Sequence, residues 1–234
     1  MAKKPITRKT RKQDTLNLYA KILIVCEGKT EVIYFDSLKR YWNIKGVKIE
    51  SIQSDLGSSP ISVVKYAKEI QEQEMYKYGE KQAYDNVFCV YDRDMHQCIN
   101  EAQNFINGYN TKSDVNITEV LSDPCFEYWL LIHFIINTKP YIATGKKTIG
   151  DQCKSQLKLY LPKYEKSNIA DFFDALMDNY SKAIKHAKLA YKNAQQVGST
   201  NPSTQVHLLL DYLNNIKQSL FNEDKPSINH KIKF

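Results

Sequence analysis

Cysteine, glycine and long apolar runs are all scarce in this sequence of 234 residues. The scarcity of cysteine and of apolar runs each argues against a class of protein. The five cysteines are scattered and form no Cys-x-x-Cys pair, so neither a disulfide framework nor a structural zinc site is expected. No apolar stretch reaches about 18 residues, which argues against a membrane span, and no apolar segment near the amino terminus suggests a secretory signal. We therefore expect a protein of the reducing cytoplasm.

The loops that mark several large enzyme classes are also missing. No Gly-x-x-x-x-Gly-Lys-Ser/Thr loop is present, so this chain is not expected to hydrolyse ATP by itself. The sequence contains neither the Gly-x-Ser-x-Gly motif of α/β-hydrolases nor the His-Glu-x-x-His motif of zinc metalloproteases, so neither class of enzyme is expected.

Charge is divided unevenly along the chain. The formal net charge is +7, but residues 13–138 contain 12 Lys and Arg against 18 Asp and Glu. Residues 1–12 contain 6 Lys and Arg and no acid, and residues 139–234 contain 15 against 8. An acidic centre between basic segments is what an enzyme acting on a polyanion needs. The alternative is that the lysines only solvate helix faces.

Two apolar runs in the acidic part, residues 22–25 and 87–91, are each followed by acids. The acids are Glu27 and Glu31 after the first run, and Asp92 and Asp94 after the second. Short, fully apolar runs are typical of strands buried in a parallel sheet, whose ligands bind beyond the carboxyl ends of the strands. Carboxylates that meet there repel one another, and Mg²⁺ or Mn²⁺ would relieve that repulsion. The alternative is that each acid caps a helix or faces water.

Strand and helix signals alternate up to residue 138, which predicts an α/β fold with a mainly parallel sheet and helices on both faces. Strands are expected at residues 21–26, 47–52, 87–92 and 115–121, and helices at 30–42, from 60, around 99–106 and at 123–136. Thr30, Ser59 and Asp123 are the expected helix caps. Further helices are expected at 169–194 and 203–220, whereas residues 157–161 fit either a strand or a helix.

This pattern divides the chain into four predicted parts. Residues 1–18 form a basic arm that can neutralise phosphates, and residues 19–138 form the α/β catalytic core. Residues 139–222 form a helical part packed on that core, and residues 223–234 form a disordered tail.

The acidic motifs carry a resemblance to a known group. Glu27-Gly28-x-Thr30-Glu31 followed by Asp92-x-Asp94 resembles the Toprim domain of topoisomerases, primases and OLD-type nucleases. The strings at residues 123–131 (Asp-Pro-Cys-Phe-Glu-Tyr-Trp-Leu-Leu) and 201–207 (Asn-Pro-Ser-Thr-x-Val-His) narrow the resemblance to the RloB-like family of bacterial proteins associated with phage defence and restriction loci.

The resemblance implies a Toprim-like fold and a metal-dependent nuclease with one or two Mg²⁺ or Mn²⁺ ions, acting in antiviral defence with an ATPase partner. It implies metal binding or proton transfer by Glu27 and metal binding by Asp92 and Asp94. Glu31 also matches the family string, although a capping role suits its place equally well. Glu127 is either exposed at a helix start or turned toward the metal, and the resemblance favours the second.

Nucleic acid is the expected substrate, as DNA or RNA. The candidate residues for holding it are basic side chains near the acids and on one face of the helix expected at residues 169–194: Lys29, Arg93, His96, Lys182, Lys185, His186, Lys188 and Lys192. The rival interpretation is an adaptor that binds nucleic acid or a partner protein without catalysis, in which the acidic cluster is structural or binds metal without turnover. Nucleotidyl transfer is a third interpretation, for which the sequence shows no nucleotide site.

Overall fold

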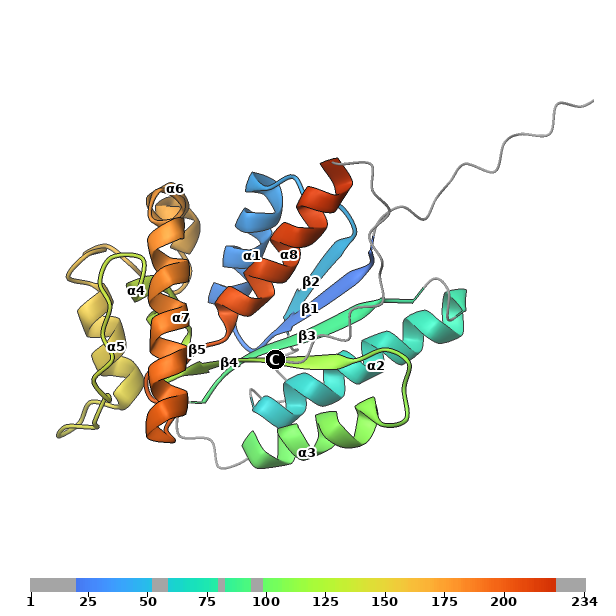
Figure 1. Ribbon diagram of the computed structural model, residues 1–234, viewed down its shortest axis with the longest axis horizontal. Coiled ribbons are helices and arrows are strands. Elements are labelled where there is room, and N and C mark those ends of the chain that lie inside the picture. The colour runs from blue at the N-terminus through green and yellow to red at the C-terminus, as the bar shows by residue number, and fades with distance from the viewer. Residues whose placement is uncertain (1–19, 52–58, 80–82, 94–98, 222–234) are drawn as a thin grey trace, which may run out of the picture.

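The computed structural model describes residues 20–51, 59–79, 83–93 and 99–221. Its centre is a five-stranded sheet in the order β2-β1-β3-β4-β5, with helices on both faces (Figure 1). The strands are β1 (Ile22–Cys26), β2 (Val47–Ser51), β3 (Asn86–Asp92), β4 (Ile117–Asp123) and β5 (Ser203–Thr204). All neighbouring pairs are parallel except β4 and β5. The predicted α/β fold, with its mainly parallel sheet and C-terminal helices, is confirmed.

Helices connect the parallel strands and then continue beyond the sheet. Those of the first part are α1 (Lys29–Tyr41), α2 (Pro60–Tyr78), α3 (Ile99–Asn110) and α4 (Phe126–Leu131). Those that follow are α5 (Ile149–Leu157), the 3-10 helix η3 (Ile169–Phe172), α6 (Phe173–Asp178), α7 (Tyr180–Val197) and α8 (Val206–Phe221). In Figure 1, α2 and α3 cover one face of the sheet, and α1 and α8 cover the other. No helix of the described residues is both long and apolar enough to cross a membrane.

Two hydrophobic cores form because side chains alternate along the buried strands. Ile22 and Ile24 of β1 face the larger core, with α1, α4 and α8, whereas Leu23 and Val25 face the smaller core, with α2 and α3. Every residue of β1 is fully buried, as the unbroken aliphatic run predicted. The strand therefore holds the residues that follow it in a fixed position.

Of the three predicted helix caps, only Ser59 is confirmed. Ser59 caps α2: its hydroxyl accepts a hydrogen bond from the Ser62 amide at 3.3 Å, and Pro60 is the first helical residue. Thr30 is not a cap, because α1 already begins at Lys29 after Gly28. The Thr30 hydroxyl instead donates to the backbone oxygen of Lys166 at 3.1 Å, a long-range contact that no local pattern encodes.

The expected cap at Asp123 is also wrong. Asp123 is the last residue of β4, the Asp123–Pro124 peptide is cis, and α4 begins only at Phe126 and ends at Leu131. β4 accordingly lies two residues later than predicted. Asp123 is buried, and its carboxylate accepts a hydrogen bond from the Thr200 hydroxyl at 2.6 Å. A partner 77 residues away thus determines the position of this acid.

The C-terminal part differs from the prediction in four places. The helix α5 was not predicted, and residues 158–161, expected as strand or helix, form a turn and a bend after it. The single helix expected at residues 169–194 is divided into η3, α6 and α7, with a break at Asn179, whose amide side chain donates to the Ala175 carbonyl at 3.0 Å. Such local side-chain bonds compete with helix continuation. The strand β5 is missed altogether, since two residues are too few to show an alternation; α8 therefore begins at Val206. The basic arm and the tail predicted at residues 1–18 and 223–234 lie outside the described residues.

Candidate active site

Glu27 comes directly after β1 and is tied to the end of β3. Its backbone amide donates to the Val90 carbonyl at 2.9 Å, which continues the strand pairing by one residue. Its carboxylate accepts a hydrogen bond from the backbone amide of Asp92 at 3.1 Å. The two predicted acid positions are therefore joined at the same edge of the sheet, as the parallel pairing of β1 and β3 requires.

Asp92, the last residue of β3, lies among other carboxylates. Burial raises the pKa of Asp92 well above its usual value, and repulsion from Glu31, Glu127 and Glu27 raises it further. These interactions place all four acids in one electrostatic cluster, which we call the acidic cluster: Glu27, Glu31, Asp92 and Glu127. Asp94 lies outside the described residues, so its relation to the cluster stays a prediction.

Glu31 lies in the first turn of α1 with 5 % of its surface exposed. Burial, with repulsion from Glu127 and Glu27, raises the pKa of Glu31 to about 7, although hydrogen bonding to backbone opposes the shift. Its carboxylate folds back over Gly28: a Cβ atom at that position would lie only 2.8 Å from Glu31 Oε2. The glycine of the motif therefore leaves room for this acid against the backbone, and a larger residue would require the Glu31 carboxylate to shift.

Glu127 is turned inward, which excludes the exposed helix start, whereas its binding of a metal stays a prediction. It lies in the first turn of α4, is 3 % exposed, and accepts a hydrogen bond from the Tyr164 hydroxyl at 3.3 Å. Lys166 Nζ lies 3.9 Å from Glu127 Oε1. Glu127 therefore belongs to the acidic cluster and not to the solvent-exposed helix start.

Tyr164 and Lys166 are site residues that the sequence did not indicate. They come from the segment between α5 and η3, which has no periodic pattern, and the Thr30 hydroxyl anchors this segment by its bond to the Lys166 carbonyl. The pKa of Lys166 is raised first by Glu127 and then by Asp92 and Glu31, against the effect of burial. Its ammonium group is thus held by the acidic cluster.

This balance predicts the effect of removing the lysine. In Lys166→Met, the pKa of Glu31 should rise further above about 7, because the cation that favours its ionised form is lost. Side-chain carboxyl shifts in NMR spectra, recorded across a pH series, measure this change. Lys163→Met is the matched control, since Lys163 is an exposed lysine of the same segment. An unchanged titration in Lys166→Met would contradict the assigned contact.

The donor chemistry of the acidic cluster fits Mg²⁺ or Mn²⁺, which prefer carboxylate oxygens. The pKa values of two of its acids, Glu31 and Asp92, are raised by burial and then by the like charges around them, and a divalent cation would relieve that repulsion. As the side chains lie, no three His, Cys, Asp or Glu residues in the described ranges are spaced to hold one ion. The acids are therefore gathered in one place but not arranged as a finished coordination sphere.

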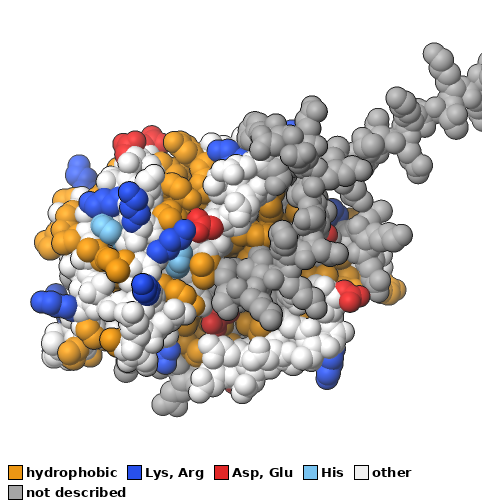
Figure 2. Space-filling view, viewed as in Figure 1, with side chains coloured by type: hydrophobic (Ala, Val, Ile, Leu, Met, Phe, Trp, Pro, Cys, Tyr) orange, Lys and Arg blue, Asp and Glu red, His pale blue; other side chains and the backbone are white. Residues whose placement is uncertain are grey.

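The basic residues predicted to hold nucleic acid are spread over two areas. Lys29 and Arg93 are exposed near the acidic cluster, and His96 lies outside the described residues. Lys and Arg side chains also gather over α7 and the elements beside it (Figure 2). There, Lys185 and Lys192 are exposed.

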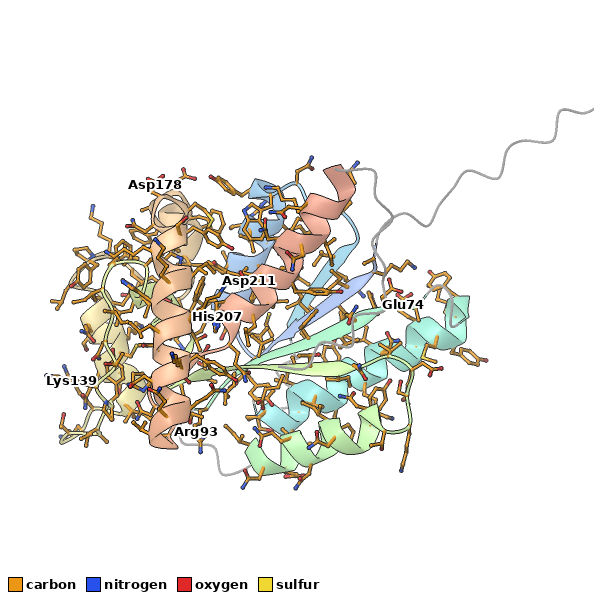
Figure 3. All side chains as sticks on the ribbon, in the orientation of Figure 1. Glu74, Arg93, Lys139, Asp178, His207 and Asp211 are labelled. Atoms are coloured by element: carbon orange, nitrogen blue, oxygen red, sulfur yellow. The ribbon has the colours of Figure 1, made fainter. Side chains whose placement is uncertain are left out.

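The other three predicted residues of α7 have partners within the fold. Lys182 donates to the Phe134 carbonyl, and the His186 ring nitrogen Nδ1 donates to the Ile132 carbonyl at 2.8 Å. Lys188 pairs with Asp211 of α8 at 2.8 Å, and Figure 3 shows Asp211 facing α7. These three residues thus join α7 to its neighbours, and among them Lys188 is paired with an acid.

Two further histidines are structural. His133 is buried, its Nδ1 donates to the Trp129 carbonyl at 2.9 Å, and burial lowers its pKa to about 4. His207 is also buried beside Tyr191, and its Nδ1 donates to the Thr204 carbonyl at 2.9 Å. Both imidazoles are therefore neutral near pH 7, and neither lies in the acidic cluster. The motif at residues 201–207 contains β5 and the first residues of α8.

Comparison with known proteins gives a family for this chain. The model of the family described as RloB-like protein matches residues 22–213, which is most of the sequence and includes the acidic cluster, Lys166 and β5. No curated protein and no solved structure matches the chain. The matched range begins at β1 and ends within α8, so it covers the sheet and the helices on both of its faces. The chain belongs to the RloB-like protein family.

Proposed function

We propose that this protein is a metal-dependent nuclease of the Toprim type, which cuts phosphodiester bonds in DNA or RNA. The observation that carries the proposal is the acidic cluster: one acid directly after β1 and three from α1, β3 and α4 lie together at the carboxyl edge of the parallel strands. Family membership and the Glu-Gly-x-Thr-Glu and Asp-x-Asp strings support the same reaction.

Each residue has a role in this proposal. Glu27, Asp92, Asp94 and Glu127 would hold one or two Mg²⁺ or Mn²⁺ ions. When bound, such an ion supplies positive charge that stabilises the phosphoryl oxygens during cleavage. Glu31, whose pKa is about 7, can accept or release a proton near neutral pH. Lys166 provides a cation that can turn from the acids to a substrate phosphate.

The defence setting and an ATPase partner in the cytoplasm are part of the proposal. Support comes from the family and from the sequence, which has no nucleotide-binding loop of the Gly-x-x-x-x-Gly-Lys-Ser/Thr kind. Any dependence of cleavage on ATP would therefore have to come from a second protein.

The proposal is tested by incubating the full chain with labelled tRNA, single-stranded DNA and duplex DNA, each with Mg²⁺ or Mn²⁺ and with EDTA. Cleavage of at least one substrate is expected with the metal and not with EDTA. Glu27→Gln should abolish it, because the change removes a charge but hardly alters volume. Glu101→Gln, an exposed acid of α3, is the matched control and should cut as the wild type does. Binding of the substrates without any cleavage would favour the adaptor instead.

A further inference from the structure

A polar cavity of about 300 Å³ lies beyond the carboxyl ends of β3 and β4. It is lined by Arg93, Asp123, Ile149 and the loop of residues 198–201, which follows α7. Figure 3 places Arg93 beside the carboxyl-terminal end of α7. The cavity has a size at the lower end of ligand pockets in proteins, and none of its lining residues belongs to the acidic cluster.

The guanidinium of Arg93 is held in one orientation at this cavity. Its Nη1 donates to the Thr200 hydroxyl at 2.7 Å, and its Nε lies 3.6 Å from Asp123 Oδ2. The Thr200 hydroxyl in turn donates to Asp123 Oδ2 at 2.6 Å, which closes a three-residue network. An arginine carries five N–H donors, and these two contacts involve only the Nη1 and Nε atoms. The side chain remains 46 % exposed, so its other donors are accessible.

The same network leaves the cavity suited to an anion. Asp123 is only 2 % exposed and its carboxylate faces Arg93 and Thr200, so the guanidinium, and not the carboxylate, is the group accessible from the opening. The first residue of α5, Ile149, lies on the wall, but Thr148 and Asp151 close the start of this helix with a capping box, so Arg93 is the cationic group of the cavity lining. An oriented guanidinium matches the geometry of a phosphate group, which it can bind through two N–H groups at once.

We infer that this cavity binds a backbone phosphate of the nucleic acid, next to the phosphate that lies at the acidic cluster. The inference rests on the proposed function. Asp92 of the cluster is the last residue of β3, and Arg93 and Asp123 of the cavity follow β3 and end β4, so both sites lie at the same carboxyl edge of the sheet. A nucleic-acid strand held at the cluster can therefore run along this edge to the cavity. Arg93 is then a positioning residue: it fixes the register of the strand and takes no part in bond cleavage. Asp123, the first residue of the motif at 123–131, and Thr200, which precedes the motif at 201–207, act by orienting it.

The test measures binding without cleavage. Metal-free full-length protein is titrated by calorimetry with inorganic phosphate and with a short single-stranded oligonucleotide. Arg93→Gln should weaken both by about tenfold, since a hydrogen bond to a charged group is lost. Thr200→Val keeps the shape and the arginine but removes its orienting hydroxyl, and should weaken both by about three- to tenfold. Lys65→Gln, which removes an exposed cation of α2, should leave phosphate binding unchanged.

Each outcome has a defined meaning. Equal affinities in the wild type, Arg93→Gln and Thr200→Val would overturn the inference. Loss of phosphate binding alone, with the oligonucleotide bound as before, would show a site for free phosphate and would also overturn it. If Arg93→Gln proves unfolded by circular dichroism, Thr200→Val decides. Because no metal and no turnover are involved, a failure of the nuclease proposal would leave these affinities unaffected.

Discussion

Asp92→Asn is expected to lower the rate of metal-dependent cleavage by at least about 100-fold. Mutation of a residue that only hydrogen-bonds to a metal ligand already lowers metal affinity or activity by about 10–100-fold, and Asp92 is proposed as a ligand itself. The Asp92 side chain comes from the end of a buried strand and lies among three other acids. Asparagine has nearly the same volume as aspartate, so the change removes one charge from the acidic cluster without altering the packing. Mn²⁺ affinity, measured by calorimetry, should fall in parallel with the rate.

The control for this prediction is Asp171→Asn, the same chemical change at an exposed position in η3. It should alter neither Mn²⁺ affinity nor cleavage. The metal-free Asp92→Asn protein should also be at least as stable as the wild type near pH 7, because burial and like charges disfavour the ionised aspartate. A folded variant that still binds Mn²⁺ as the wild type does would contradict the role of Asp92 in the cluster.

Glu31→Gln is expected to change how stability depends on pH. The pKa of Glu31 is raised from 4.5 to about 7 in the folded protein, so between these values the folded state holds a proton that the unfolded chain has released. The free energy of unfolding of the metal-free wild type therefore falls as pH rises from about 4.5 to about 7 and stays low above that range. At 1.36 kcal/mol per pKa unit, the loss amounts to as much as about 3 kcal/mol.

Urea unfolding of wild type and variant at a series of pH values measures this effect. Glutamine has no proton to release, so Glu31→Gln should lack this contribution and exceed the wild type in stability at pH 8. Glu101→Gln, with its side chain in solvent, should follow the wild-type curve. Parallel curves for wild type and Glu31→Gln would show that Glu31 does not carry the predicted proton. Saturating Mn²⁺ should reduce the difference, because the metal binds ionised carboxylates.

The sequence predicted those parts of the fold that depend on local pattern. The aliphatic run before Glu27 and the acids after each strand were enough to place β1, β3 and their carboxyl ends, because parallel strands bring those ends together. Ser59 and Pro60 marked a helix start in the same way. The inward position of Glu127 was favoured only with the help of the family resemblance, since an acid in a first helical turn is equally suited to solvent.

What the sequence could not show depends on contacts between distant residues. Thr30 and Asp123 each have the chemistry of a cap, yet both are bonded to residues more than 70 positions away, and these bonds decide their roles. Lys166 lies in an aperiodic segment, so nothing in its neighbourhood indicates that it reaches the acids. The basic face of α7 was predicted from helical spacing, which cannot distinguish a lysine in solvent from one that bonds a carbonyl.

The antiparallel pairing of β5 with β4 has a consequence for the order in which the protein is made. A ribosome releases β4 long before β5, because the hydroxyls of Ser122 and Thr204 that meet between these strands are 82 residues apart. The lysine that meets the acids is likewise synthesised 136 residues after Thr30, to which it is anchored. A nascent chain that carries all four acids thus still lacks its sheet edge, its lysine and its oriented arginine. The acidic cluster therefore gains its lysine, and Arg93 its orienting hydroxyl, only after the whole parallel part of the sheet has been synthesised.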